Sequence, residues 1–326
     1  MVSFSTIQAS NRRILSELPA GLVAVFAGAT AGIGEISLKT FAKYTKGPRA
    51  YFIGRSREAA ERIMSECQAI NLTGQYTFLA ADLSLVKGMD EVCKEIKAKE
   101  KTINLLFLSA GIPSMDRTPT SEGLFQLAAL NYYCRIRMIS NLLPLIQASQ
   151  SLKRIVYVGG GGYEGKLDTN DFQGLNVEMA DLRPHLTALV TLGLQTVAKQ
   201  ASDVSIVHNY PGTVPTRFLD AVPEEMLEHL TIMPLHECGE RQVYLATSAT
   251  YPAATKSDAN KGVQAESGAN VIIGVDGKPG SGLYSVGSDC ESASSEVRAH
   301  LAEMRQQGLI DQVWQHTQAE FQHITA

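Results

Sequence analysis

The chain has 326 residues, 44% of them hydrophobic and 19% charged, with a formal net charge of −4 and a mean hydropathy of −0.03. This balance is typical of a globular core and argues against a nucleic-acid surface, which needs concentrated Lys and Arg. The five cysteines are widely spaced, no cluster has metal-ligand spacing, and no apolar run reaches membrane-spanning length, so we expect free thiols, no metal and a cytoplasmic protein that does not bind membranes.

Short runs rich in β-branched and aromatic residues alternate with longer helical segments. This alternation predicts an α/β fold, a Rossmann-like doubly wound parallel sheet of about seven strands with helices on both faces. The expected strands are Leu22–Ala27, Ala50–Ile53, Gln75–Ala80, Ile103–Ser109, Arg154–Val158, Val204–His208 and Leu283–Val286. The expected helices are Gly32–Tyr44, Arg57–Ile70, Leu85–Ala98, Ser121–Gln147, Asp181–Gln200, Ser294–Gln307 and Gln312–Ile324.

Three segments interrupt this alternation. Residues 1–20 form an N-terminal extension with room for a short helix, and Gly165–Ala180 is a polar insertion. Ala253–Ser281 is rich in small and polar residues and is expected to be a long exposed loop. Since no linker or internal repeat divides the chain, we expect a single Rossmann-type domain over residues 1–326.

A buried strand runs directly into a glycine turn, and the turn runs directly into a helix. The first glycine allows the tight turn, the second leaves room for a pyrophosphate, and the third lets the helix pack on the strand. The free N–H groups of the helix attract phosphate. This context predicts dinucleotide binding, the alternative being a turn that binds nothing. The residues expected to contact the cofactor here are Gly28, Thr30, Gly32, Ile33 and Gly34.

Arginine replaces the carboxylate that would favour NAD at the end of the second strand. The sequence there reads Ile-Gly-Arg-Ser-Arg, with Arg55 and Arg57 available for a ribose 2′-phosphate. The cofactor is therefore predicted to be NADP(H), with Arg55 as its main contact. The alternative is that both arginines are solvated side chains at a helix start.

Two further strand ends carry cofactor candidates. Asp82 follows the third strand and could accept from the adenine amino group, or could cap the next helix. Ser109 and Gly111 follow the fourth strand, where small residues let the backbone lie beside a cofactor.

Over about residues 20–250 the chain resembles the short-chain dehydrogenase/reductase family. The resemblance implies that Pro211, Gly212 and Thr216 lie against the nicotinamide end of the cofactor. It also makes a homodimer, paired through the helices after strands four and five, a candidate assembly. Segments 120–124 and 171–174 are similar to those of a fungal branch, often of secondary metabolism. The matching elements are the glycine turn, Asp82, Ser109-Ala110-Gly111, Asn131 and Tyr210-Pro211-Gly212-Thr213-Val214-Pro215-Thr216.

Similar enzymes use Asn, Ser, Tyr and Lys for catalysis, with the Tyr as the proton donor and the Lys lowering its pKa. Asn131 stands at the expected place. The serine position after the fifth strand falls in the glycine run 159–162, and residues 181–188 contain neither the Tyr nor the Lys. The nucleotide site is thus predicted to be intact while three of the four catalytic residues are missing.

Several side chains could act as a substitute acid. Tyr163 follows the glycine run, and His185 lies near the missing Lys position. Packing against the insertion and a place on the helix surface are their respective alternatives. Asp181 and Arg183 could bind polar groups or could be a helix cap and a solvated side chain, while His208 fits a core position better.

Segment 218–234 is expected to be a substrate lid, because it carries several methionines, leucines and a phenylalanine. An amphipathic helix packed on the core would explain the same pattern. The sequence therefore predicts an NADP(H)-binding enzyme that acts on a hydrophobic small molecule by atypical or non-redox chemistry, such as isomerisation or cyclisation. The alternatives are an NADPH-dependent ketone reductase with a substitute acid and a non-catalytic protein that senses NADP(H).

Overall fold

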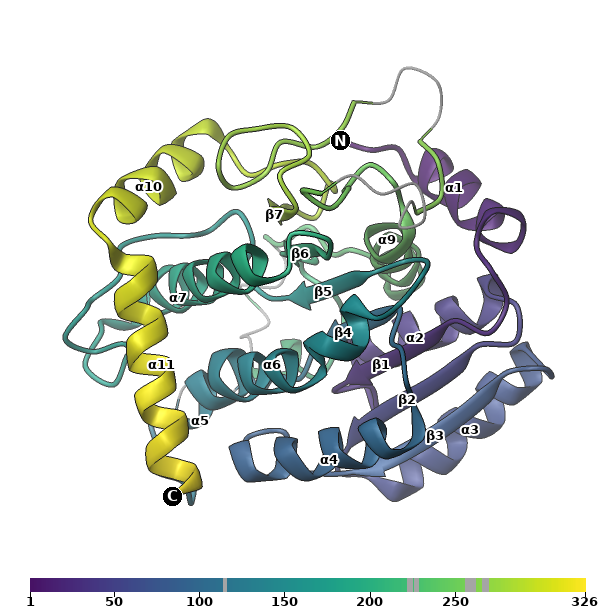
Figure 1. Cartoon of the computed structure of the whole chain (residues 1–326), viewed down its shortest axis with the longest axis horizontal. Coiled ribbons are helices and arrows are strands. Elements are labelled where there is room, and N and C mark those ends of the chain that lie inside the picture. The colour runs from purple at the N-terminus through teal and green to yellow at the C-terminus, as the bar shows by residue number, and fades with distance from the viewer. Residues whose placement is uncertain (114–115, 222–224, 226–228, 256–261, 266–269) are drawn as a thin grey trace.

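A computed structural model describes residues 1–113, 116–221, 225, 229–255, 262–265 and 270–326. Within these ranges the centre of the molecule is a seven-stranded sheet of parallel strands in the order β3-β2-β1-β4-β5-β6-β7 (Figure 1). This arrangement confirms the predicted Rossmann-like fold. The strands are β1 Val23–Ala27, β2 Arg49–Gly54, β3 Gln75–Ala80, β4 Leu105–Leu108, β5 Arg154–Val158, β6 Ser205–Asn209 and β7 Leu283–Val286.

Helices cover both faces of the sheet (Figure 1). One face carries α1 Phe4–Glu17, α2 Gly32–Tyr44, α3 Arg57–Ile70 and α9 Leu235–Thr247. The other carries α4 Val86–Lys99, α6 Cys134–Gln147, α7 Met179–Gln200, α10 Ser295–Gln306 and α11 Leu309–Thr325. Three short helical segments complete the set: α5 Gln126–Ala128, the π-helical turn η1 Ala129–Tyr133 and the 3-10 turn η2 Leu219–Ala221.

The long helix expected from Ser121 begins later than predicted, at Gln126. Residues 120–124 form a turn instead, in which the Thr120 N–H donates to the Leu124 carbonyl at 2.7 Å. The Glu122 carboxylate accepts from the backbone N–H groups of Val86 and Lys87 at 2.5 and 3.0 Å. Because these are the first free donors of α4, this carboxylate caps the neighbouring helix.

Sequence reasoning missed α9. Its segment is rich in charged residues and contains Gly239, which hides a helix that is buried along most of its length. A Cβ atom on Gly239 would lie 2.6 Å from the Thr40 Oγ1 atom of α2, so the glycine allows these two helices to approach closely. Arg154 of β5 donates to the Leu245 and Ser248 carbonyls at 2.7 and 2.9 Å, holding the end of α9 against the sheet.

The N-terminal extension contains a helix of 14 residues, α1, that packs against α9 and α2. Asn11 of α1 is buried and donates to the carboxylate and the carbonyl of Glu240 in α9. The same carboxylate accepts from the Tyr44 hydroxyl of α2 at 2.8 Å. A buried carboxylate therefore joins three helices, and α1 is an integral part of this layer.

The described parts of segment 253–281 are not uniformly exposed, which corrects the expectation of an exposed loop. Val263, Ile272 and Val275 are buried, and the Val263 N–H donates to the Thr247 carbonyl at 2.7 Å. These residues pack where α9 and β7 leave apolar surface uncovered. Positions 256–261 and 266–269 of this predicted loop lie outside the described residues.

The five cysteines are buried and free, as predicted. Burial raises the pKa of the Cys67 thiol to about 12, which keeps it protonated and unreactive. Among the described residues no helix is long and apolar enough to cross a membrane.

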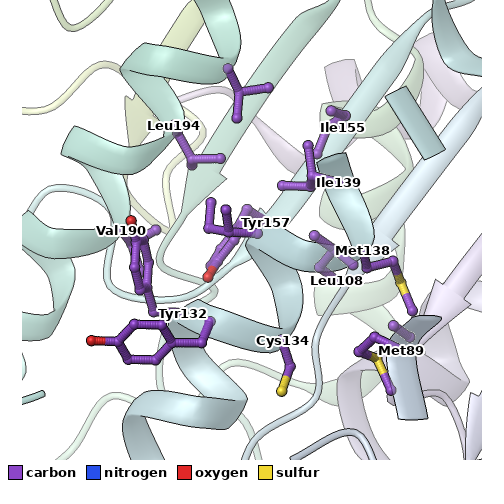
Figure 2. Close-up of a cluster of buried hydrophobic side chains, with 14 of the residues drawn as sticks. Met89, Leu108, Tyr132, Cys134, Met138, Ile139, Ile155, Tyr157, Val190 and Leu194 are labelled. Carbon is purple, nitrogen blue, oxygen red and sulfur yellow. The ribbon is translucent and has the colours of Figure 1, made fainter. Parts of the chain in front are cut away.

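Tyr157 of β5 lies in the largest core cluster, between side chains of α6 and α7 such as Ile139 and Val190 (Figure 2). Its ring is fully covered, and its hydroxyl donates to the Asn131 carbonyl in η1. The core therefore extends up to the carboxyl edge of the sheet, where it fixes the backbone around Asn131.

Candidate active site

A groove of about 300 Å³ opens at the carboxyl ends of β1 and β4. The strand order reverses between these two strands, and ligands of open α/β sheets bind at such a switch point. Ten of the predicted cofactor residues line this groove together. They are Gly28, Thr30, Gly32, Ile33, Gly34, Arg55, Asp82, Ser109, Gly111 and Thr216.

The glycine turn brings the ends of β1 and β4 into close contact. Gly28 has a φ of +89°, and a Cβ atom there would lie 2.5 Å from the backbone of Ala110. A Cβ atom on Gly34 would lie 2.3 Å from the Gly28 carbonyl oxygen. No described side chain caps the start of α2, so its first N–H groups remain available to an anion at the groove.

Arg55 lines the groove and is exposed, whereas Arg57 is exposed but does not line it. Among the described residues neither guanidinium has a carboxylate partner. In contrast, Arg62 of the same helix pairs with Glu35 at 2.7 Å. Arg55 is thus the cation that is free to meet an anionic ligand at the end of β2, as predicted for a 2′-phosphate.

Asp82 lines the groove and also organises its own turn. Its Oδ1 atom accepts from the Ser84 N–H at 2.9 Å and from the Ser84 hydroxyl at 2.7 Å. The alternative role as a cap of α4 is taken by Glu122, so Asp82 holds a local turn at the groove.

Pro211 and Gly212 do not line this groove. Pro211 is buried, and a Cβ atom on Gly212 would lie 3.2 Å from Ser288 and 3.3 Å from Met233. They belong to the segment that leads to the lining residue Thr216. The groove residues that sequence reasoning missed include Gln126, Leu130, Arg217 and Phe218.

Phe218 was expected in the lid. It follows β6 in the sequence, and its ring packs against the loop after β4. Its ring reaches within 3.0 Å of the position of a Cβ atom on Gly111 and is 48% exposed. The Met233 N–H donates to the Thr213 carbonyl at 2.8 Å, which returns the segment to the Pro-Gly element. Positions 222–224 and 226–228 of the expected lid lie outside the described residues.

Asn131 does not line the groove itself but sits beside it, in the π-helical turn η1 between the lining residue Leu130 and the core. Its amide oxygen is 4.0 Å from the Cβ position of Gly111. Its main-chain carbonyl accepts from Tyr157, which leaves the side-chain amide facing the loop after β4. Insertions of this kind in helices are frequent at functional sites.

The first three glycines of the run after β5 leave no room for a serine side chain. A Cβ atom on Gly160 would lie 2.2 Å from the Thr187 Oγ1 atom, and one on Gly159 would lie 2.7 Å from His208 Nε2. Thr187 is held in place because its hydroxyl donates to the Arg183 carbonyl at 2.8 Å. The protein's own side chains therefore fill the space that the family's serine would need.

A buried polar network lies behind this run. The Gly160 N–H donates to His208 Nε2 at 3.3 Å, so Nδ1 carries the proton and donates to the Thr191 hydroxyl at 2.9 Å. That hydroxyl donates in turn to the Glu164 carboxylate at 2.8 Å, and Ser285 donates to the same oxygen at 2.5 Å. Burial raises the pKa of Glu164 and, together with the Arg135 charge, lowers the pKa of His208 to about 3.

Arg135 is a buried cation that sequence reasoning missed. Its guanidinium donates to the carbonyls of Leu108 and Val158 at 3.3 and 2.6 Å and also to the Ala110 carbonyl. It clamps the carboxyl ends of β4 and β5 beneath the site, and burial lowers its pKa. An arginine within the apolar run of the long helix is the signal that could have identified it.

His185 is buried, and backbone groups of the polar insertion occupy both of its ring nitrogens. Nδ1 accepts from the Asp168 N–H at 3.2 Å, and Nε2 donates to the Phe172 carbonyl at 3.1 Å. The alternative interpretation, a surface side chain at the helix end, is therefore wrong. With both nitrogens engaged, this geometry favours a role in holding the insertion over the predicted catalytic role.

Tyr163 lies at the outer side of the glycine run and is 47% exposed. Its ring packs edge-on against Tyr210, with centroids 5.0 Å apart, and the Arg183 guanidinium lies over both rings. No described residue accepts a hydrogen bond from its hydroxyl. Of the three predicted catalytic residues, Tyr163 is the one with a free and accessible acidic group.

The fold and the groove define a Rossmann-type nucleotide-binding protein. The family model for short chain dehydrogenases matches residues 22–162. Oxidoreductase AN1596 of Emericella nidulans is 36% identical over 98% of each chain. Short-chain dehydrogenase/reductase SAT2 of Stachybotrys chartarum is 30% identical over 94% of each chain. The chain therefore belongs to the short-chain dehydrogenase/reductase family, as the resemblance implied, and its fungal relatives fit the predicted branch.

Solved structures show the same fold at low sequence identity. The Pseudomonas aeruginosa RhlG/NADP active-site complex is similar with a TM-score of 0.55 and 20% identity, over 76% of this chain and 96% of that chain. The L-sorbose reductase from Gluconobacter frateurii, complexed with NADPH and L-sorbose, also has a TM-score of 0.55, with 16% identity over 70% of this chain and 90% of that chain.

Proposed function

We propose that the protein binds NADP(H) and acts on a hydrophobic small molecule by atypical or non-redox chemistry, such as isomerisation or cyclisation. One contrast carries the proposal. The groove at β1 and β4 keeps the glycine turn and a free Arg55, while the serine space after β5 is filled by Thr187. Retaining the nucleotide groove without the usual acid fits a chemistry other than ordinary ketone reduction.

The groove residues fit the dinucleotide. The uncapped start of α2 would hold the pyrophosphate, and Arg55 would meet a 2′-phosphate, for which no carboxylate stands in the way at the end of β2. When bound, NADPH supplies a hydride and NADP⁺ accepts one. The two similar solved structures named above are complexes with NADP and with NADPH, which supports this choice of cofactor.

Exposed apolar side chains are most frequent in the segments after β5 and β6. Six of the eleven exposed large hydrophobic residues among the described residues belong to these segments. They are Tyr163, Leu175, Met179, Phe218, Leu230 and Ile232. Of these, Phe218 lines the groove itself, and apolar groups at a groove are typical of a ligand-binding surface, which supports a hydrophobic substrate, as secondary metabolites often are.

One observation favours a second candidate, an NADPH-dependent ketone reductase. The Tyr163 hydroxyl is free and half-exposed at the edge of the glycine run, so it could donate a proton to a substrate carbonyl.

Cytoplasmic location and pairing as a homodimer stay predictions. Pairing through α6 and α7 would have to accommodate α11, whose Phe321 ring lies 5.2 Å from the Arg137 guanidinium of α6.

The cofactor assignment is tested by exchanging the charge at the end of β2. Arg55→Asp should weaken NADPH binding at least tenfold, because a charge-assisted hydrogen bond to phosphate contributes roughly 1.5–3 kcal/mol. Arg57→Asp, outside the groove, serves as the matched control and should have a smaller effect. Calorimetry that found equal affinities of the unaltered protein for NADPH and NADH would contradict the assignment.

The chemistry is tested with NADPH and a panel of hydrophobic ketones. If the chemistry is atypical, the unaltered protein should leave the NADPH absorbance nearly unchanged. Rapid NADPH consumption that is lost in Tyr163→Phe would instead establish the reductase, since general acids typically contribute 10²–10⁴-fold. Rapid consumption that persists in the Tyr163→Phe, His185→Ala double variant would contradict both candidates.

A further inference from the structure

An arginine–tyrosine stack stands beside the glycine run. The Arg183 guanidinium carbon lies 4.3 Å from the centroid of the Tyr163 ring and 4.7 Å from that of the Tyr210 ring. The two rings meet at 84°, with their centroids 5.0 Å apart. Nearly perpendicular rings cannot both stack on one planar guanidinium, but the two contacts fix its position, and an edge of N–H groups remains available for hydrogen bonds.

Among the described residues, nothing uses that edge. No carboxylate or carbonyl accepts from the Arg183 guanidinium, although Asp181 lies two residues away. Other arginines of the protein are paired, for example Arg137 with Asp90 at 2.6 Å and Arg241 with Glu237 at 2.7 Å. Arg183 is therefore a positioned cation without an anion.

The stack lies at the carboxyl edge of the sheet. Tyr163 follows β5 and Tyr210 follows β6, and Arg183 is in the second turn of α7. One turn further along α7, Thr187 touches the Cβ position of Gly160, which belongs to the glycine run where the family's serine was expected. The cation thus lies within residues 181–188, the region from which the family's Tyr and Lys are missing.

Apolar groups flank the cation on one side. Met179 is one helical turn before Arg183 and shares its face of α7, and its side chain is 46% exposed. Leu175 is 39% exposed and close to Met179, because Arg117 donates to the Leu175 carbonyl and also contacts the Met179 sulfur. A ligand at this place would meet one cation and an apolar surface.

We propose that Arg183, held by Tyr163 and Tyr210, is a substrate-binding subsite for a carboxylate on an otherwise hydrophobic molecule. A guanidinium can donate two parallel N–H···O hydrogen bonds to one carboxylate. The apolar side chains would contact the remainder of the ligand. The inference rests on the proposed function for its substrate site, and it narrows that substrate from a hydrophobic molecule to a hydrophobic acid.

The test compares acids with neutral amides of the same shape. Phenylacetate and naphthaleneacetate are titrated against phenylacetamide and naphthaleneacetamide by calorimetry, with and without saturating NADP⁺. The unaltered protein should bind each acid more tightly than its amide. Arg183→Gln should weaken acid binding at least tenfold, the usual worth of a charge-assisted pair, and should leave amide binding and NADP⁺ affinity unchanged.

Three further variants sharpen the result. Arg12→Gln removes another exposed arginine, on α1 and far from the stack, and should change nothing. Tyr163→Phe keeps the ring and should preserve acid binding, whereas Tyr163→Leu removes the ring and should weaken it. These two variants distinguish the effect of the Tyr163 hydroxyl from the effect of its ring. A catalytic role of the hydroxyl therefore does not affect the test of acid binding.

The subsite is overturned if the unaltered protein binds acid and amide equally or binds neither, or if Arg183→Gln weakens both alike. It is also overturned if Arg183→Gln lowers NADP⁺ affinity, because the arginine would then serve the dinucleotide. If the unaltered protein binds the acids but does not bind NADP⁺, the proposed function is refuted while the carboxylate subsite is still supported.

Discussion

Glycine does opposite things at the two halves of the sheet edge. After β1, Gly28 and Gly34 let the ends of β1, β4 and α2 meet closely, and a groove remains open beside them. After β5, Gly159 and Gly160 yield their space to His208 and Thr187 of the same chain. The same residue type therefore marks a retained ligand site in one place and a closed one in the other, and only the neighbouring side chains tell the two apart.

The largest effect is expected from adding a methyl group at Gly28, where the ends of β1 and β4 are in close contact. Gly28→Ala should lower the free energy of unfolding by about 3 kcal/mol or more, because the residue has positive φ and no space beside Ala110. Gly123→Ala is the matched control, with a φ of +79° but nothing within 4 Å of its Cβ position. Denaturant unfolding measures both, and equal losses would show that the contact with Ala110 does not matter.

The second half is tested by restoring the family's serine. Gly160→Ser should cost about 2 kcal/mol through overpacking against Thr187. Thr187→Ala removes the obstructing hydroxyl, so the double variant should recover part of that loss. A double-mutant cycle in denaturant unfolding measures the coupling, and strictly additive losses would contradict the proposed filling of the serine space.

The smallest effect is a pH dependence that belongs to the second half alone. The folded-state pKa of His208 is about 3, below its ordinary 6.5, so the unfolded chain binds more protons below pH 6.5. The stability from neutral His208 is thus present above that pH and is lost as the pH falls, by up to about 1.4 kcal/mol per pH unit. His208→Asn should be less stable near neutral pH but should lose less on acidification.

Glu164 acts in the opposite sense and separates the two groups. Its pKa is raised by burial, so its contribution is present below its ordinary value of 4.5 and is lost as the pH rises through the folded value. Between about pH 6.5 and 5, the free energy of unfolding should therefore fall more steeply with acidification in the unaltered protein than in His208→Asn, and the difference between the two slopes reports His208. Parallel unfolding curves for the two proteins over this range would contradict the buried neutral histidine.

The sequence was informative where the structure depends on neighbours along the chain. The apolar strands Gln75–Ala80, Arg154–Val158 and Leu283–Val286 were predicted with their observed bounds, and the glycine turn lies in the groove as expected. These features follow from local hydrophobicity and from residue spacing.

The rest depends on distant contacts. The environment of Glu164 is set by Ser285, 121 residues away, and the burial of α9 is set by α1, α2 and the sheet. The buried position of His185 was not predicted, because its partners belong to an insertion whose path the local pattern does not define. Arg183 was considered for polar binding, but its two tyrosines come from separate strand ends and meet only in the fold.

The strand order has a consequence for synthesis on the ribosome. Each strand after β1 pairs with a strand that has already been made, so the sheet can grow outward from its centre as the chain emerges. The helix α1 is the exception. It is made first, yet Asn11 binds Glu240, 229 residues later, and so it cannot dock until α9 has left the ribosome. The first helix to be made is thus among the last to find its place.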